Sequence, residues 1–364
     1  MESKKNGAVK EKPKLVDVAK LAGVSISTAS RALAGHRGVS ARTIQEVRDV
    51  AAQLGYPLRL SPHESDTTST LGVIVANIAS PFFASLIESI EESAAKRGYN
   101  IILCNSDNQL KKQHEYLNLM IEKRIDGLII VPVQMADTML EDLVAQGLPV
   151  VQVDRYVEGL ACDVVTSNNQ DASYQAVDFL IQQGYKRIAI VSGPLTHSTG
   201  RDRMEGYCRA LRDNDYPISD RLVKTGGLKS VAGYQLASQL IASPDERPDA
   251  LFVTTYEMTM GVLLAIRDHG LVIPRDIGIV AFDDFENACL LEPPLTTVDQ
   301  PVHELGAAAA DLLIRRIEDY PNEYEPVKVQ LRCRLIMRRS TRFQERVHLP
   351  ADVPAANQKQ PNIG

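Results

Sequence analysis

The N-terminal part of the chain contains the segment LVDVAKLAGVSISTASRALAGHRGVSARTIQEVRDVAAQLGY, residues 15–56. Its pattern predicts three short helices, the first over Asp17–Ala22, the second after a cap at Ser25 and the third after a cap at Ser40. Gly23 ends the first helix because glycine adopts the left-handed turn that other residues resist. This order of elements is typical of a helix-turn-helix, whose second helix enters the major groove of DNA. An ordinary three-helix mini-domain is the alternative.

The apolar residues of each predicted helix fall on one face. The core candidates are Val18, Ala19, Leu21 and Ala22 in the first helix, Thr28, Ala29, Ala32 and Leu33 in the second, and Ile44, Val47, Ala51 and Leu54 in the third. On the second helix, Ile26, Ser27, Ser30 and Arg31 are left on the outer face. We therefore expect this outer face to be the one that meets DNA.

The distribution of charge supports a DNA-binding head. Residues 1–60 carry a net charge of +6, although the whole chain carries −6, so residues 61–364 carry −12. A basic head displaces counterions from the phosphates of the duplex, and an acidic body does not. For residues Lys4–Lys14, a merely solvated charged tail and a disordered arm that brushes phosphates fit equally well.

Length and composition limit the number of domains and the class of protein that the rest of the chain can form. Its 364 residues, 44% of them hydrophobic, are enough for a head and a core of two lobes. No apolar run approaches the ~18 residues of a membrane span, and the charged N-terminus has no signal-peptide core, so we expect a cytoplasmic protein. The five cysteines and seven histidines show neither disulfide nor metal-ligand spacing, so we expect no metal site.

From Leu71 onward, short apolar runs alternate with helical stretches. The predicted strands are Leu71–Val75, Ile101–Cys104, Leu128–Val131, Val150–Val153, Ile188–Ser192, Leu251–Thr254 and Ile277–Ala281. The predicted helices are Phe82–Arg97, Lys111–Lys123, Ala136–Gln146, Ala172–Gln182, Arg201–Asp213, Val231–Ile241 and Met258–Asp268. This alternation predicts parallel sheets covered by helices, with ligands bound at the carboxyl ends of the strands. The glycine-rich motifs of nucleotide sites are absent from the sequence, so we expect no nucleotide cofactor.

Several ordered blocks of this sequence resemble the lactose-repressor family (LacI/GalR type) of bacterial transcription regulators. The blocks in the head are Asp17-Val-Ala, Ala22-Gly-Val-Ser, Ser27-Thr-Ala-Ser-Arg31, Val39-Ser40 and Leu54-Gly-Tyr56. The blocks in the body are Ser80-Pro-Phe-Phe83, Asp126-Gly-Leu-Ile129, Pro149 to Arg155, Arg203-Met-Glu-Gly-Tyr207, Ile273-Pro274, Ala281-Phe-Asp-Asp284 and Pro293 to Val298. The resemblance implies a helix-turn-helix head, a hinge, and a two-lobed α/β core similar to periplasmic sugar-binding proteins. It also implies a dimer on a pseudo-palindromic operator and a small effector in the cleft between the lobes.

The resemblance assigns roles to residues of the head. Ile26 and Ser27 occupy the positions that family members vary to read bases, and Arg31 can pair bidentately with guanine. We expect the other polar residues of the head to hold phosphates: Ser25, Thr28, Ser40 and Arg42.

The segment that follows the third helix departs from the family pattern. A family hinge helix carries Asn-x-x-Ala-Arg-x-Leu, whereas this chain has a shorter run over residues 58–66 with a proline and two acids. Leu58 or Leu60 would supply the apolar wedge into the minor groove. A flexible tether is the alternative, because residues 61–70 are rich in Ser, Thr, Asp and Pro.

The effector contacts implied by the resemblance are Phe83, Asp154, Arg203, Thr255 and Asp283. Phe83 would stack on an apolar sugar face, the carboxylates would accept hydrogen bonds from hydroxyls, and Arg203 would fork onto an oxygen pair. Two acids usual in the family are replaced, by Tyr256 and by Asn168, so we favour an anionic ligand such as a sugar acid or sugar phosphate over a neutral sugar.

Structural roles are the alternatives for these cleft residues. Asp283 and Asp284 would stabilise the turn after a strand, and Arg203 would pair with a carboxylate that bridges the lobes.

We therefore expect a repressor that acts without catalysis or cofactor. The predicted parts are a DNA-binding head over residues 1–58, a linker over 59–70, a two-lobed core over 71–340 and a flexible tail over 341–364. Since the tail has three prolines and a single leucine, it cannot form the leucine-heptad coiled coil of tetrameric relatives, and a dimer is expected. A cytosolic solute-binding protein and a sugar-converting enzyme on the same scaffold are the alternatives.

Overall fold

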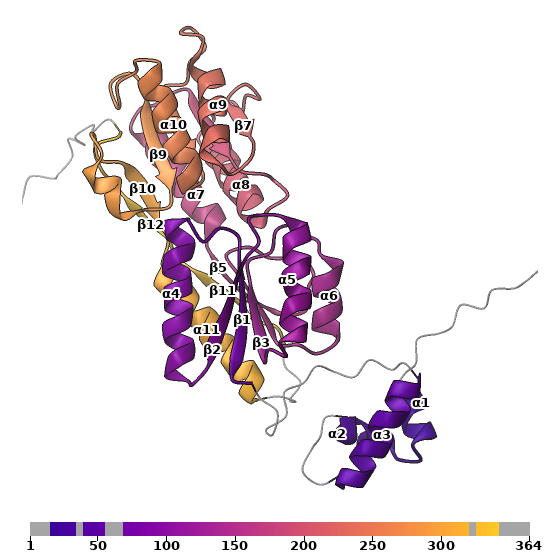
Figure 1. Ribbon diagram of the computed structural model, residues 1–364. Coiled ribbons are helices and arrows are strands. Elements are labelled where there is room, and N and C mark those ends of the chain that lie inside the picture. Colours follow the sequence, from indigo (N-terminus) through magenta and orange to yellow (C-terminus); the bar gives the residue numbers. More distant parts are fainter. Residues whose placement is uncertain (1–14, 34–38, 55–67, 320–324, 342–364) are drawn as a thin grey trace, which may run out of the picture.

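The computed structural model describes residues 15–33, 39–54, 68–319 and 325–341 (Figure 1). Its described N-terminal part is a bundle of α1 (Leu15–Leu21), α2 (Ile26–Leu33) and α3 (Ala41–Leu54). The larger part contains two six-stranded sheets, each covered by helices, which form an N-terminal lobe and a C-terminal lobe. These features confirm the predicted fold class of a helix-turn-helix head with a two-lobed parallel-sheet core.

Local sequence signals build the head as expected. Gly23 has a φ of +67° between α1 and α2. The Ser25 hydroxyl accepts the Thr28 amide at 3.0 Å and caps α2, and the Ser40 hydroxyl accepts the Thr43 amide at 3.1 Å and caps α3.

The small core of the head is formed by Val18, Ala19, Ala29, Ala32, Val47 and Ala51. The expectation that Leu21 joins this core is wrong, because its side chain is 57% exposed. At 3.6 residues per turn, Leu21 lies about 110° away from the direction shared by Val18, Ala19 and Ala22.

The N-terminal lobe begins with alternating strands and helices. These are β1 (Thr70–Val75), α4 (Pro81–Lys96), β2 (Asn100–Asn105), α5 (Leu110–Glu122), β3 (Gly127–Ile130), α6 (Thr138–Ala145), β4 (Val150–Val153) and β5 (Asp163–Ser167). The sheet order is β11-β5-β4-β3-β1-β2, and its described pairs are parallel. The expectation of a buried strand over Ile101–Cys104 is wrong, because β2 lies at the sheet edge and Leu103 is 41% exposed.

The C-terminal lobe repeats this plan. Its elements are α7 (Asn169–Gln182), β6 (Ile188–Ser192), α8 (Ser198–Asp213), β7 (Val223–Thr225), α9 (Ser230–Ile241), β8 (Ala250–Val253), α10 (Tyr256–Asp268), β9 (Gly278–Phe282), the short 3-10 helix η1 (Glu286–Leu290) and β10 (Thr296–Asp299). The sheet order is β12-β10-β9-β8-β6-β7, in which β12 is antiparallel to β10.

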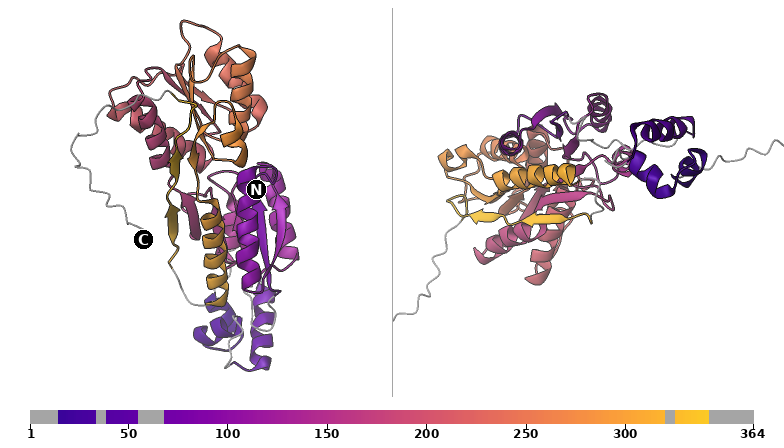
Figure 2. Two further views of the ribbon diagram at one scale, coloured as in Figure 1. Left: turned by 90° about the vertical axis from the view of Figure 1, so that its left-hand side faces the viewer. Right: turned by 90° about the horizontal axis from the view of Figure 1, so that it is seen from below.

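The chain crosses between the lobes three times. It leaves the N-terminal lobe between β5 and α7, returns between β10 and α11 (Val302–Glu318), and leaves again between β11 (Lys328–Leu331) and β12 (Arg334–Ile336). Helix α11 packs on α4 in the core of the N-terminal lobe. Figure 2 shows the two lobes end to end, with the yellow C-terminal strands passing from one to the other. Each lobe is thus completed by segments distant in sequence.

Strands β5, β7, β10, β11 and β12 and helix α11 were not predicted from the sequence. Strand β5 reads DVVTS and β10 reads TTVD, so their polar residues hide the apolar pattern of a strand, yet nearly all of these residues are buried. Among the described helices, none has the length and apolar composition needed to cross a bilayer.

Candidate functional site

The candidate DNA-binding surface lies at the start of α2 and α3. Ile26 is 52% exposed at the first position of α2, which fits contact with a base. The Ser25 hydroxyl lies 2.7 Å from that of Thr28, and the Ser40 hydroxyl lies 2.8 Å from that of Thr43. Each capping serine therefore also forms a hydrogen bond with the threonine three residues later. Arg42 is exposed and pairs with Glu46 at 2.9 Å within α3.

Four of the predicted DNA contacts cannot be placed as side chains. Leu58 and Leu60 lie outside the described residues, and for Ser27 and Arg31 the described part is the α2 backbone. The expected base and minor-groove contacts of these residues therefore stay predictions.

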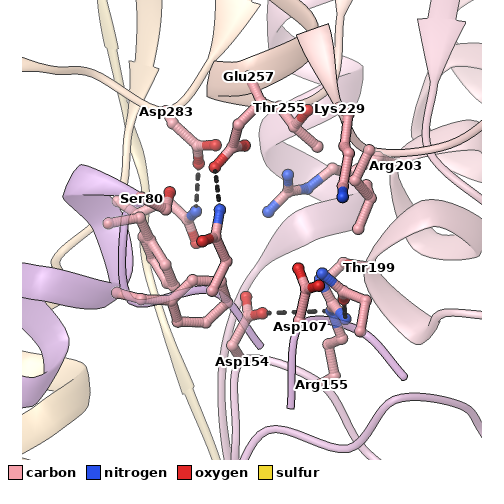
Figure 3. Close-up of a pocket in the computed structure, with 16 residues that line it drawn as sticks. Ser80, Asp107, Asp154, Arg155, Thr199, Arg203, Lys229, Thr255, Glu257 and Asp283 are labelled. Carbon is pink, nitrogen blue, oxygen red and sulfur yellow. Dashed lines mark hydrogen bonds and ion pairs between the residues drawn. The ribbon is translucent and has the colours of Figure 1, made fainter. Parts of the chain in front are cut away.

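The second candidate site is a cleft between the two lobes. Its lining includes all five predicted effector residues: Phe83, Asp154, Arg203, Thr255 and Asp283. They come from the ends of β4, β8 and β9 and from helices α4 and α8, so residues far apart in sequence meet in one cleft (Figure 3). The space inside it is about 650 Å³, counting the space that is open to solvent.

Arg203 is held by the C-terminal lobe. Its Nε donates to Asn169 Oδ1 at 2.8 Å, its Nη1 donates to the Thr254 carbonyl at 2.5 Å, and its guanidinium lies 3.6 Å from the Phe282 ring centroid. The alternative of a lobe-bridging carboxylate is thus wrong, because these acceptors are an amide and a backbone carbonyl of one lobe. The side chain is 4% exposed and points into the cleft (Figure 3).

Asp283 and Asp284 have different partners. Asp283 accepts the Tyr256 amide at 3.1 Å and the Gln300 side-chain amide at 2.6 Å, and it lines the cleft. Asp284 instead accepts both Nη atoms of Arg338 at 2.8 Å. The structural role that we considered for both residues fits Asp284 fully and Asp283 in part.

The backbone is left-handed at the two cleft carboxylates that directly follow a strand, Asp154 and Asp283. Asp154 follows β4 with a φ of 65°, and Asp283 follows β9 with a φ of 74°. Aspartate tolerates this region better than most residues, and such strained positions gather at functional sites. The turns direct both carboxylates towards the cleft.

Asp154 lies among buried charged side chains, those of Arg155 and Arg203. Arg155 Nε lies 3.6 Å from Asp154 Oδ2, and Arg155 Nη1 donates to Asn108 Oδ1 at 2.7 Å. Burial raises the pKa of Asp154 despite the neighbouring Arg155 and Arg203. Burial, and to a lesser extent Arg155, lowers the pKa of His197 to about 3, so this imidazole is neutral at neutral pH.

Several cleft residues were missed from the sequence. The main ones are Asn77, Asp107, Arg155, Lys229, Glu257 and Gln300. A signal existed for Arg155, which follows Asp154 directly at the end of a predicted strand. Gln300 follows β10, which was itself missed.

Glu257 joins the two lobes inside the cleft. Its Oε1 accepts the Asn77 side-chain amide at 3.1 Å, and Asn77 lies in the loop between β1 and α4 of the opposite lobe. Burial raises the pKa of Glu257, although hydrogen bonds from Ser80 and Asn77 counteract this.

The lining of the cleft carries charges of both signs. Asp107, Asp154, Glu257 and Asp283 line it together with the cations Arg155, Arg203 and Lys229. Neither Asn168 nor Tyr256, where the sequence suggested the loss of an acid, is among the residues that line the cleft, whereas Asp107 and Glu257 supply carboxylates there. Figure 3 shows Asp283 and Glu257 on one side, and Arg203 and Lys229 on the other.

Comparison with known proteins agrees with this architecture. A family model described as bacterial regulatory proteins, lacI family, matches residues 14–57. A second model, described as periplasmic binding proteins and sugar binding domain of LacI family, matches residues 68–339. The two matches together span the helix-turn-helix and both lobes.

Individual relatives are similar over most of the chain. The transcriptional repressor PurR of Pasteurella multocida is 32% identical, covering 90% of this chain and 98% of its own length. Catabolite control protein A of Priestia megaterium is 34% identical, covering 90% of this chain and 99% of its own. Both named relatives are regulators rather than enzymes, which sets the enzyme alternative aside.

A solved structure extends the similarity to the lobes. The LacI-family regulator of Enterococcus faecium with bound ribose is 29% identical, covers 75% of this chain and 98% of its own, and has a TM-score of 0.67. With both domain models matched, the chain belongs to the LacI family of bacterial regulatory proteins.

Proposed function

We propose that this protein is a transcriptional repressor that binds a pseudo-palindromic operator as a dimer and responds to a neutral carbohydrate in the interlobe cleft. The proposed parts are the head over residues 1–58, the linker over 59–70, the sensor over 71–340 and the tail over 341–364. A cytoplasmic location follows from this function, since the operator is there.

Two buried polar atoms in the cleft carry the effector assignment. Arg155 Nε and Gln300 Oε1 are buried and form no hydrogen bond among the described residues, although Arg155 Nε lies 3.6 Å from Asp154 Oδ2 as an ion pair. One is a donor and the other an acceptor, and leaving such groups buried without a partner is costly. Hydroxyl groups both donate and accept, so a polyhydroxyl ligand satisfies both kinds of atom.

The charges of the lining favour a neutral ligand. Four carboxylates accompany three cations, and two of these cations already interact with other groups, Arg155 with Asp154 and Arg203 with the Thr254 carbonyl. A sugar phosphate or sugar acid would meet Asp283 and Glu257, whereas a neutral sugar would donate hydrogen bonds to them. Phe82 and Phe83 lie edge to face at 5.1 Å and offer apolar surface to a sugar ring.

Ribose is the first probe, because the similar Enterococcus faecium regulator binds it. We expect D-ribose to raise the melting temperature, with ribose 5-phosphate and ribonate as anionic comparisons. Calorimetry would then measure affinity in the wild type and in Gln300→Leu, which removes the buried acceptor. Stronger binding of the two anions than of ribose and other neutral pentoses and hexoses would contradict a neutral effector.

The head would act through the second helix. Ile26, Ser27 and Arg31 are the proposed base contacts, and Ser25, Thr28, Ser40 and Arg42 the proposed phosphate contacts, with Leu58 or Leu60 as the minor-groove wedge. Effector binding would favour one lobe arrangement and so change the spacing of the two heads. Such coupling typically changes operator affinity roughly five- to 150-fold. Gel shifts with and without the effector test it.

Exposed apolar side chains support the dimer. Leu290 in η1 is 76% exposed, and Met337, just beyond β12, is 59% exposed. Helix α4 lies on the same side of the molecule as β10 and β12 (Figure 1), so both lobes contribute to this face. We expect light scattering to give a dimer that Leu290→Asp weakens. A stable tetramer, or a dimer that Leu290→Asp does not weaken, would contradict this interface.

A further inference from the structure

Outside the cleft, a second group of polar side chains joins the lobes, which we call the interlobe latch. Tyr156 and Glu158 follow β4 in the N-terminal lobe, while Ser198, Arg201 and Asp202 lie in the first turns of α8 in the C-terminal lobe. None of these five residues is among those that line the cleft.

The latch is a network rather than a single ion pair. The Tyr156 amide donates to Ser198 Oγ at 3.1 Å, and the Tyr156 hydroxyl accepts Arg201 Nη2 at 2.7 Å and donates to Asp202 Oδ2 at 3.4 Å. Arg201 Nη1 also pairs with Glu158.

Backbone contacts lie beside the latch. The Met135 amide donates to the Thr196 carbonyl across the lobes at 3.2 Å, and the Glu158 amide donates to the Met135 carbonyl at 3.1 Å. Lys328 Nζ lies 4.3 Å from the centroid of the Tyr156 ring and supports the ring from the N-terminal lobe. Breaking the side-chain network therefore loosens the amides of Met135 and Tyr156, whose partners Thr196 and Ser198 lie in the other lobe.

The latch adjoins the cleft in sequence on both sides. Tyr156 directly follows Asp154 and Arg155, and Arg201 stands two residues before Arg203. Successive residues of α8 thus serve the cleft and the latch. A ligand that holds Arg203 and Asp154 together also brings Arg201 and Tyr156 together.

We propose that the latch sets the fraction of protein with closed lobes, and through it the effector affinity, without contacting the effector. The part about affinity rests on the proposed effector function. These contacts join the two lobes, so they favour the lobe arrangement of this structure, which we call closed, whether or not a ligand is bound. A ligand that needs closed lobes binds with an apparent affinity scaled by the closed fraction.

The strength of the latch suits a regulatory role. The side chain of Arg201 is 37% exposed and that of Glu158 58%, so water and salt weaken their attraction. Water and salt would weaken a fully buried network less. A half-exposed one shifts the open and closed populations by a modest factor, which a ligand can still override.

The decisive test needs no effector. Arg201→Gln removes the charged fork, and Arg209→Gln is a matched control on the same helix, since Arg209 is 35% exposed and pairs with Asp171 at 2.7 Å within the C-terminal lobe. We expect hydrogen exchange at the Met135 and Tyr156 amides to quicken roughly two- to tenfold in Arg201→Gln and to stay unchanged in Arg209→Gln. Tyr156→Phe, which removes the hydroxyl alone, provides a second variant in case Arg201→Gln folds poorly.

Unchanged exchange in folded Arg201→Gln and Tyr156→Phe, or equal quickening in Arg209→Gln, would overturn the latch. D-ribose provides the second arm, with a matching loss of affinity expected in Arg201→Gln but not in Arg209→Gln. If the wild type does not bind ribose, that sugar fails as effector, and the exchange result still decides whether the latch exists. Wild-type ribose affinity in a variant with quickened exchange would refute the link to affinity.

Discussion

Replacing Arg203 with alanine should destabilise the C-terminal lobe as well as remove an effector contact. Two hydrogen bonds from a charged donor are lost, to Asn169 Oδ1 and to the Thr254 carbonyl, together with the stack on Phe282. Each such hydrogen bond contributes ~1.5–3 kcal/mol, and a buried cation–π contact up to ~2 kcal/mol.

These contributions do not add fully, because water from the cleft can reach the space that the guanidinium leaves. We therefore expect the free energy of unfolding to fall by ~2–4 kcal/mol and the melting temperature by roughly 5–10 °C. Arg209→Ala is the control, since its half-exposed pair on the same helix should contribute less than ~1 kcal/mol.

The chain has no tryptophan, so urea unfolding is best followed by far-ultraviolet circular dichroism. Stability of Arg203→Ala within ~0.5 kcal/mol of the wild type would refute the argument from buried partners. Arg203→Lys keeps the charge but cannot form two hydrogen bonds in a fork. Its free energy of unfolding should lie between those of the wild type and Arg203→Ala.

Three further predictions concern packing, pH and DNA. Gly261→Ala would place a Cβ 1.9 Å from the Ser230 carbonyl oxygen and force α9 and α10 apart, so we expect a loss of ~1–3 kcal/mol in urea unfolding, and an unchanged midpoint would contradict this close crossing. Burial lowers the pKa of His197 from its ordinary 6.5 to about 3 in the folded protein, so the unfolded chain binds this proton first and stability should fall as pH drops through this window. His197→Gln should flatten that slope, and an unaltered pH profile would show that His197 is not the group responsible. Arg31→Ala should weaken operator binding by ~1–3 kcal/mol and relax base preference at one position per half-site, whereas equal losses on operator and scrambled duplex in gel shifts would reduce Arg31 to a phosphate contact.

The elements that the sequence predicted correctly depend on local signals. Gly23, Ser25 and Ser40 set the ends of the head helices through backbone conformation and capping, which involve neighbours only a few residues away. Uninterrupted apolar runs such as β3 and β8 predicted buried strands, and the alternation of strands and helices predicted parallel sheets. The family resemblance located all five effector candidates that line the cleft.

Only the tertiary structure decided how those residues are used. Gln300 reaches the cleft because it lies in the crossing between β10 and α11, and Glu257 reaches it because it lies in the first turn of α10. Neither residue carries a local signal in the sequence. Arg203 has an amide and a carbonyl as partners, and Arg201 meets Tyr156 across the lobes, because helix packing brings together segments more than 30 residues apart. Caps and apolar periodicity are properties of neighbouring residues, and the sequence determined them alone, whereas burial, charge pairing and the latch depend on which distant segments pack together.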